Sequence, residues 1–173
     1  MPTLTKNRLL RLLQHRWTDE SDLKRALPGA AVPHLEQKVR DSETHHSGEI
    51  CVCVEAGLPL SYLWKGLCAR DRAVTLFGKL RVWDTETNNG VLIYLLLADH
   101  AIEIVADRGL NTRVSAAEWA AVIEGLRADL RAGRFEPGLI AAVDAVDRLL
   151  RQHYPLTEGQ KNPNELPDAV VLL

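Results

Sequence analysis

Residues 85–109, TETNNGVLIYLLLADHAIEIVADRG, decide the fold of this chain. They contain two apolar runs, 91–97 and 101–106, which only Ala98-Asp99-His100 separate. Runs of six or seven residues rich in Val, Ile, Leu and Tyr, joined by so short a turn, predict a β-hairpin. The first run shows no polar alternation, which is typical of a strand buried on both faces, so we expect helices above and below the sheet.

The hairpin also predicts where a functional site would lie. Antiparallel pairing brings the start of the first strand beside the end of the second. Asn88-Asn89-Gly90 should therefore lie near Asp107-Arg108-Gly109. This end of the sheet would hold a carboxylate, two amides and two glycines on a rigid apolar platform.

A third strand is expected at residues 49–56, EICVCVEA, followed by a helical pattern over residues 61–80. A connection that contains a helix is what two parallel strands require, so residues 49–56 and 91–97 should run parallel. Their first residues then share one edge of the sheet. Ser47, Gly48, Glu49 and Thr85 would join the hairpin residues there.

The N-terminal region reads as helices. Residues 4–17 form a basic amphipathic pattern, which we expect to pack on the domain or on a second subunit through Leu9, Leu10 and Leu13. Binding to a membrane surface is the alternative use of such a face. A short helix should follow and end at Pro28-Gly29, and another should begin near Pro33.

Two further helices are expected after the hairpin, over residues 116–132 and 137–153, and together they suit one face of the sheet. The tail, 156–173, should be irregular, with its last apolar residues docked on something apolar. We therefore divide the chain into an N-terminal helical extension, 1–42, an α/β domain, 43–155, and the tail. The predicted fold is a three-layer α/β/α sandwich around a small mixed sheet.

Composition narrows the class of protein. The chain has 173 residues, a formal net charge of −2 and an isoelectric point of about 6.3, which gives no support for nucleic-acid binding. Three cysteines in apolar segments predict a reduced, cytoplasmic protein. No apolar run approaches the ~20 residues of a membrane span, and we expect no signal peptide. Common enzyme signatures such as the P-loop are absent from the sequence.

Several residues that can bind metals have simpler interpretations. His45 and His46 are adjacent and would point about 100° apart on a helix, so we expect exposed residues at a helix end. Cys51 and Cys53 alternate on a strand and are expected to be small core side chains, since a structural zinc site asks for four ligands. Asp99-His100 is read as a turn.

Three motifs together resemble the TPM domain family: SGEI at residues 47–50, T..NNGVLIY at 85–94 and IEIVADRGL at 102–110. A helix containing Trp119 follows them, and the resemblance covers residues 43–154. It implies an α/β/α sandwich, an acidic site at a loop edge that in some relatives binds calcium or another divalent ion, and a phosphatase activity that is uneven across the family. The matching site residues are Glu49, Thr85, Asn89 and Asp107, with Arg108 and Gly109 shaping the last loop.

Two functions follow as hypotheses. The first is a soluble, noncatalytic module that binds a divalent ion, a partner or another copy of itself. The alternative is a metal-dependent phosphatase that acts on phosphate monoesters. Oxygen ligands favour Ca²⁺ or Mg²⁺ over zinc. The simplest competing interpretation is that Asn89-Gly90 and Asp107-Arg108-Gly109 are turns whose side chains satisfy backbone groups.

Overall fold

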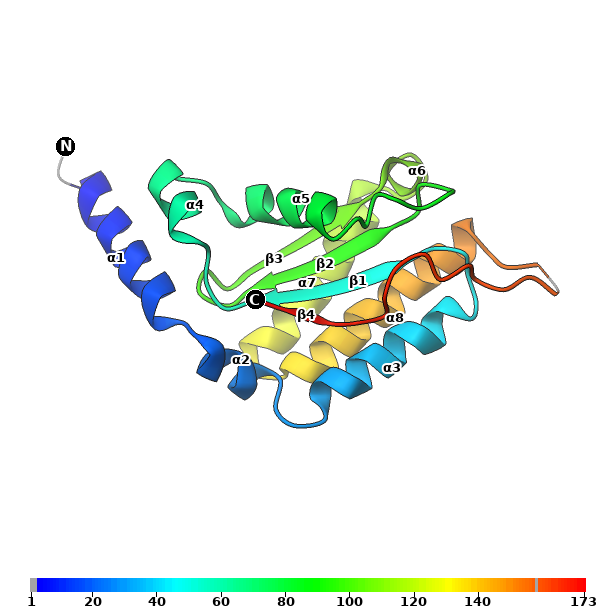
Figure 1. The fold of residues 1–173 in the computed structure, drawn as a ribbon, viewed down its shortest axis with the longest axis horizontal. Coiled ribbons are helices and arrows are strands. Elements are labelled where there is room, and N and C mark those ends of the chain that lie inside the picture. The colour runs from blue at the N-terminus through cyan, green and yellow to red at the C-terminus, as the bar shows by residue number, and fades with distance from the viewer. Residues whose placement is uncertain (1–2, 158) are drawn as a thin grey trace.

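The computed structural model describes residues 3–157 and 159–173, and a four-stranded mixed sheet runs through its centre (Figure 1). The strand order across the sheet is β3-β2-β1-β4. The strands are β1 (Ile50–Glu55), β2 (Val91–Leu96), β3 (Ala101–Ala106) and β4 (Val171–Leu172).

The pairing predicted for the first three strands is confirmed. β1 and β2 are parallel, with Ile50 opposite Val91, and β2 and β3 are antiparallel, with Val91 opposite Ala106. The turn between β2 and β3 needs few residues, whereas the chain between β1 and β2 crosses over through helices. The lengths of the connections therefore account for the relative directions of the three strands.

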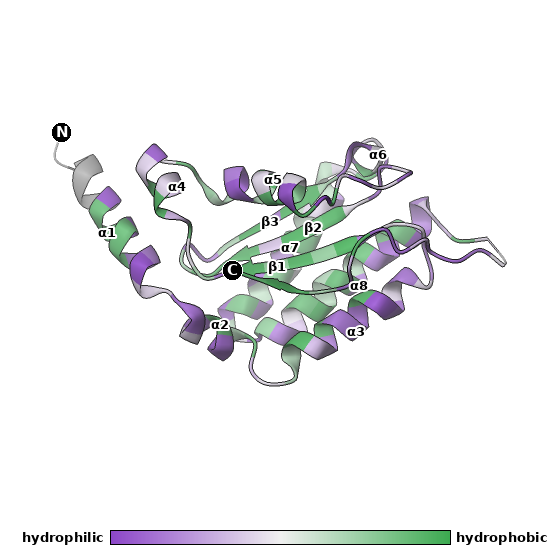
Figure 2. Ribbon diagram, viewed as in Figure 1, coloured by the Kyte–Doolittle hydropathy of each residue, from purple (hydrophilic) through white to green (hydrophobic). Residues whose placement is uncertain are grey.

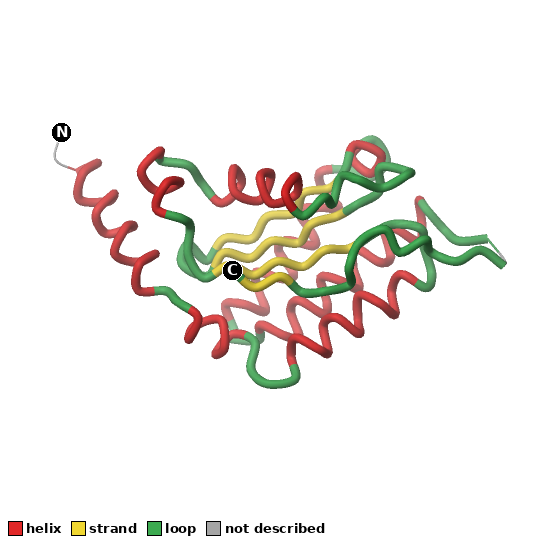
Figure 3. Tube along the Cα trace, in the orientation of Figure 1, coloured by secondary structure: helices red, strands yellow, loops and turns green. Residues whose placement is uncertain are grey.

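Helices cover both faces of the sheet, which confirms the α/β fold with its N-terminal helices (Figure 3). They are α1 (Thr3–Trp17), α2 (Glu20–Ala26), α3 (Ala31–Glu43), α4 (Leu60–Lys65), α5 (Ala69–Lys79), α6 (Arg108–Asn111), α7 (Ala116–Arg131) and α8 (Phe135–His153). One hydrophobic core lies between the sheet and α3, α7 and α8, and a second lies between the sheet and α4 and α5. The sheet is thus the middle of three layers.

Alternation along β1 sends its side chains into the two different cores. Ile50, Val52 and Val54 belong to the first core, while Cys51 and Cys53 belong to the second, as the period of two predicts. The expectation that these cysteines are core residues is confirmed by their burial. Burial also raises the pKa of the Cys51 thiol to about 12.

The C-terminal tail contributes a strand that the sequence did not reveal. β4 pairs in parallel with β1, with Cys53 opposite Val171 and Val54 opposite Leu172. The prediction that the last residues dock on an apolar surface is right, but the form of docking is sheet pairing. Two residues are too short a run for a period-two pattern to stand out.

The helical pattern predicted over residues 61–80 forms two helices, α4 and α5. Gly66 adopts the left-handed conformation, with φ of 71°, and ends α4, after which Cys68 begins α5. Glycine reaches this conformation without steric cost, so it serves as a helix terminator. The crossover keeps its direction because two short helices connect the strands as well as one does.

The N-terminal helices divide into two kinds. Leu23 of α2 and Leu35 and Val39 of α3 are part of the first core, so these helices belong to the body of the domain. α1 lies at the edge of the molecule, and its Leu9 and Leu10 are more than half exposed. Of the two expected ways to cover these leucines, packing on the domain is therefore wrong, and packing on a second subunit stays a prediction. In the described part of the chain, no helix is long and apolar enough to cross a membrane; the cytoplasmic location stays a prediction.

Candidate functional site

Three segments meet at the end of the sheet where β1 and β2 begin, beside α6 (Figure 1). We call residues 47–49, 85–90 and 107–109 the loop edge. The amide of Asp107 donates to the carbonyl of Gly90 over 2.9 Å, and the amide of Gly109 donates to the carbonyl of Asn88 over 3.1 Å. The amide of Val91 donates to the carbonyl of Glu49 over 2.9 Å. All the segments that the sequence assigned to a site are therefore neighbours.

Two glycines permit this close approach. A Cβ at position 90 would collide with the carbonyl oxygen of Val82. A Cβ at position 109 would lie 2.5 Å from the carbonyl oxygen of Asn88 and 2.6 Å from the hydroxyl of Tyr154. Gly90 and Gly109 are thus required by packing, because any larger residue would push the loops apart.

Asn89 is completely buried at the loop edge and only partly satisfied. Its amide donates to Thr85 Oγ1 over 3.0 Å, and its side-chain Nδ2 donates to Ser47 Oγ over 3.3 Å. Its Oδ1 is buried and has no hydrogen-bond partner among the described residues. A buried acceptor in this state costs about 1–3 kcal/mol unless something else binds it.

Asp107 has the same asymmetry. Its Oδ1 accepts from the amide of Arg108 over 2.7 Å, which caps the short helix α6. Its Oδ2 is buried and has no hydrogen-bond partner in the described part of the chain. The Arg108 side chain itself is exposed, while Asn88 takes a left-handed turn with φ of 53°. The loop edge therefore presents two unsatisfied oxygen atoms, on Asn89 and Asp107.

Glu49 is buried but engaged. Its Oε1 accepts from the amide of Glu165 over 3.1 Å, and its Oε2 accepts from the amide of Leu166 over 3.3 Å. Burial raises the pKa of Glu49 to about 7, although the two backbone donors work against this rise. Glu49 therefore holds the C-terminal tail against the loop edge, a role that its position in the sequence does not reveal.

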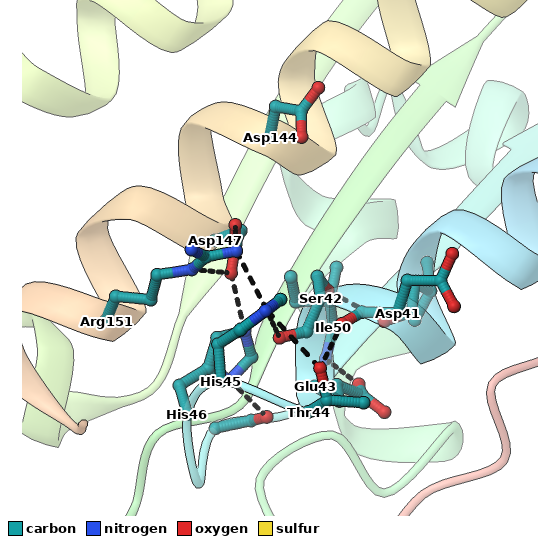
Figure 4. Close-up of polar contacts among 12 residues, drawn as sticks. Asp41, Ser42, Glu43, Thr44, His45, His46, Ile50, Asp144, Asp147 and Arg151 are labelled. Carbon is teal, nitrogen blue, oxygen red and sulfur yellow. Dashed lines mark hydrogen bonds and ion pairs between the residues drawn. The ribbon is translucent and has the colours of Figure 1, made fainter. Parts of the chain in front are cut away.

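Glu43, at the end of α3, was not predicted as part of any site. It is 5% exposed, and its Oε1 accepts from the amide of Ile50 over 3.0 Å (Figure 4). Burial raises the pKa of Glu43 to about 9, and the nearby carboxylates of Glu49 and Asp168 add to this effect. Glu43 and Asp168 also line a cavity of about 380 Å³ between α3 and the tail. Only the folded tail brings Asp168 there, so no local sequence pattern could have found this group.

His46 differs from the prediction. It is completely buried rather than exposed, and its Nδ1 lies 3.0 Å from the carbonyl oxygen of Gly48, to which it donates (Figure 4). Its Nε2 lies 3.5 Å from Asp147 Oδ1, and Arg151 contacts the Asp147 carboxylate at 2.7 and 2.8 Å. Burial lowers the pKa of His46 to about 4, so the ring is neutral near pH 7. The adjacent His45 is exposed, as predicted, and contacts Arg151 instead.

The charged groups set limits on metal binding. Within residues 3–157 and 159–173, no three His, Cys, Asp or Glu side chains are placed to hold one metal ion. Any cation at the loop edge would therefore depend on one carboxylate, with amide, hydroxyl or carbonyl oxygens and water. Such a ligand set suits a hard cation and does not suit zinc.

The mixed sheet between two helical layers, with a polar loop edge at the start of its parallel strands, defines an α/β domain of the TPM type. The TPM domain family model matches residues 21–149, and the chain belongs to this family. The match begins within α2, so it includes α2 and α3, which the sequence analysis had placed mostly in an extension.

Two solved structures are similar. The NMR structure of the BA42 protein from the psychrophilic bacterium Bizionia argentinensis has a TM-score of 0.73 and 27% sequence identity, over 84% of this chain and 94% of that one. The solution NMR structure of the N-terminal domain of a P. gingivalis protein has a TM-score of 0.57 and 21% identity, over 78% of this chain and 85% of that one. The second likeness shows the fold alone. The comparison with curated proteins finds no match.

Proposed function

We propose that the loop edge binds a divalent cation, Ca²⁺ or Mg²⁺, and that the domain is a noncatalytic ion-binding module. The supporting observation is a pair of buried oxygens on adjoining loops, Asn89 Oδ1 and Asp107 Oδ2, for which the described residues supply no hydrogen-bond partner. Capping α6 needs one carboxylate oxygen, and a second oxygen that is buried without a partner calls for another explanation. Asp107 uses one oxygen for the backbone and leaves the other free of such contacts.

The proposal gives the predicted ligands different roles. Asp107 and Asn89 supply the oxygens that contact the ion, because hard cations prefer carboxylate and carbonyl ligands. Thr85 Oγ1 accepts a hydrogen bond from the amide of Asn89 and thereby positions Asn89. Glu49 fixes the tail beside the loops. With a single carboxylate in contact, we expect weak affinity, with a Kd on the order of 10⁻⁴–10⁻³ M.

The alternative function, hydrolysis of phosphate monoesters, needs a nucleophile or an activated water. Ser47 carries a hydroxyl at the loop edge, but its Oγ accepts from Asn89 Nδ2, and no imidazole or carboxylate bonds to it in the described part of the chain. A metal-bound water would be the remaining nucleophile. Ion binding needs only ligand oxygens, whereas hydrolysis also needs a nucleophile or an activated water. We prefer the noncatalytic module for that reason.

Isothermal titration with CaCl₂ and MgCl₂ tests the proposal on three chelator-treated proteins: the parent, Asp107→Asn and Asp144→Asn. Asn keeps the Oδ1 that caps α6 and removes the negative charge, so the fold should survive. Asp144 is a matched control because its carboxylate pairs with Lys38 on the surface. We expect binding by the parent and Asp144→Asn and a loss of at least tenfold in Asp107→Asn.

Thermal unfolding provides an independent measurement. An ion at ten times its Kd stabilises the folded state by about 1.4 kcal/mol, and this shift should vanish in Asp107→Asn. Absence of binding by the parent at millimolar ion, or equal binding by Asp107→Asn, would contradict the proposal. Metal-dependent hydrolysis of p-nitrophenyl phosphate that disappears in Asp107→Asn would instead favour the phosphatase.

A further inference from the structure

The described side chains of α1 make their polar contacts with the rest of the molecule along one side of the helix. Arg8 donates to the carbonyl of Trp64 over 2.8 Å, and Arg11 contacts Asp99 at 2.8 Å. His15 Nε2 lies 2.9 Å from Asp99 Oδ1, while its Nδ1 accepts from the amide of Leu58. At 100° per residue, the contact residues of α1 lie on one side of the helix. Mostly polar contacts therefore attach α1 to α4 and to the hairpin turn.

The other side of α1 carries an uncovered apolar stripe. Leu9 is 59% exposed, Leu10 57%, Leu13 38% and Trp17 74%. These four positions fall within about 100° of the helix circumference, opposite the side that contacts the domain. Figure 2 shows hydrophobic segments along α1 at the outer edge of the molecule. Large apolar residues gathered on one exposed helix face are typical of a binding surface.

The neighbouring helix α4 carries exposed apolar residues of its own. Its Trp64 is 80% exposed and its Leu60 is 66% exposed. They are four residues apart and so lie on the same face of α4. Two exposed tryptophans are therefore found on the two neighbouring helices, and tryptophan is enriched where proteins meet the headgroup layer of a bilayer.

Charge indicates what could cover the stripe. α1 contains Lys and Arg but no Asp or Glu. The first 26 residues of the chain hold six Lys and Arg against three Asp and Glu, whereas the remaining residues hold fifteen against twenty. The apolar stripe thus belongs to the cationic end of a chain whose remainder is anionic. An anionic surface fits it, and the rest of the molecule would be kept away from that surface.

A second copy of the chain fits less well. Pairing α1 with α1 would bring cationic helices together. Two adjoining cavities with apolar floors, of about 410 and 390 Å³, lie at the hairpin-turn end of the sheet and share Leu97 and Phe135. Arg127 and Arg131 line the first cavity, which would repel the α1 of another copy, whereas Arg25 in the second is paired with Asp22.

We propose that α1 binds the surface of an anionic phospholipid bilayer. The stripe of Leu9, Leu10, Leu13 and Trp17 enters the interface between headgroups and acyl chains, and the exposed Arg16 contacts the headgroups. An apolar stripe flanked by cations is the arrangement of interfacial helices. The attraction to anionic lipid adds to the burial of the stripe.

Vesicle co-sedimentation of the full chain tests this proposal. The vesicles are phosphatidylcholine alone or phosphatidylcholine with 30% phosphatidylserine, at low and high salt. We expect the parent to bind the anionic vesicles at least tenfold more strongly than the neutral ones, and to bind them several-fold less at high salt. The double variant Leu13→Ser/Trp17→Ser should lose at least tenfold in binding.

Trp83→Ser is the matched control, because Trp83 is 51% exposed and lies outside α1 and α4. It should bind like the parent, and circular dichroism should show that all variants fold. No binding to anionic vesicles, or equal binding by the double variant, would overturn the proposal. So would light scattering that shows a dimer of the parent and a monomer of Leu13→Ser/Trp17→Ser, because a second copy would then cover the stripe.

Discussion

The two ends of the sheet treat buried carboxyl groups in opposite ways. At the end where β1 finishes, Glu55 accepts from Arg72 at 2.7–3.1 Å and from the hydroxyl of Tyr94 at 2.6 Å. At the end where β1 begins, Glu49 accepts only from backbone amides. Glu55, the last residue of β1, thus has a cationic partner, whereas Glu49, just before β1, is held by backbone amides.

The difference shows where an added cation would be useful. A buried carboxylate is tolerated when a guanidinium neutralises it, as Arg72 does for Glu55. In and beside the loop edge, burial raises the pKa of Glu49 to about 7 and that of Glu43 to about 9. That end of the sheet therefore favours uncharged carboxyl groups or a positive ligand, which agrees with the proposed role of Asp107.

The largest loss of stability is expected from breaking the Arg72–Glu55 ion pair, at the end of the sheet where β1 finishes. Arg72→Met leaves Glu55 buried and without its cation, and should lower the free energy of unfolding by about 3–5 kcal/mol. Urea denaturation at pH 7 measures this loss. Adding Glu55→Gln should restore much of it, since the amide carries no charge and still accepts from Tyr94. Arg25→Met, whose partner Asp22 is on the surface, should change stability by less than about 0.5 kcal/mol.

Beside the loop edge, removing the buried charge of Glu43 should raise the free energy of unfolding rather than lower it. Because the pKa of Glu43 is higher in the folded state, the unfolded state releases this proton first, and parent stability falls as pH rises from about 4.5 towards 9. Glu43→Gln keeps an acceptor for the amide of Ile50 and does not titrate. We expect it to gain on the order of 2 kcal/mol over the parent at pH 8, and little at pH 5.

Urea denaturation at both pH values checks this prediction. Glu20→Gln is the control, because the Glu20 side chain is 78% exposed. A loss of stability in Glu43→Gln at pH 8 would show that the ionised carboxylate is favourable in the fold.

The sequence was sufficient for the hairpin and its directions, because long apolar runs and connection length carry that information locally. It also brought the segments of Asn89 and Asp107 together, since register places the ends of paired strands side by side. It did not predict the burial of His46. A histidine that follows a helix looks exposed in sequence, and only the packing of α8 with Asp147 encloses it.

The contacts of the tail were equally hidden. Glu165, Leu166 and Asp168 lie more than a hundred residues from Glu43 and Glu49, and no periodic pattern connects them. The leucines of α1 do not pack on the domain for a related reason. Amphipathic periodicity shows that one face is apolar, but Arg11 and His15, through their contacts with Asp99, decide which face meets the domain.

A smaller loss of stability is expected from weakening the attachment of α1 to Asp99, at the same end of the sheet as Glu55. Burial opposes ionisation of Asp99, but contacts with Arg11 and His15 outweigh it and lower its pKa. The resulting stability is present above the ordinary pKa and is lost as pH falls below it. Asp99→Asn should cost about 1–2 kcal/mol at pH 7 and free α1. Limited trypsin digestion should cleave after Arg11 or Arg16 faster than in the parent.

Asp84→Asn is the control for this change, because Asp84 pairs with Arg81 on the surface. Unchanged digestion of Asp99→Asn would mean that Leu12 and the backbone contacts suffice to hold α1.

The smallest change in the free energy of unfolding is expected for Glu49→Gln. The comparison is between Glu49 and Glu43, two buried carboxyl groups at the end of the sheet where β1 begins. Glu43 accepts from one backbone amide and has the higher pKa, whereas Glu49 accepts from two and has the lower one, since each amide favours the ionised form. In Glu49→Gln, relief of the buried charge is opposed by the loss of one acceptor for the tail, about 1 kcal/mol. The net change in the free energy of unfolding at pH 8 should stay within about 1 kcal/mol of zero, well below the gain in Glu43→Gln. Hydrogen exchange at the amide of Glu165 or Leu166 should nevertheless quicken by roughly five- to tenfold, because one of them loses its partner. A global gain as large as that of Glu43→Gln, with both tail amides unaffected, would show that the tail does not depend on Glu49.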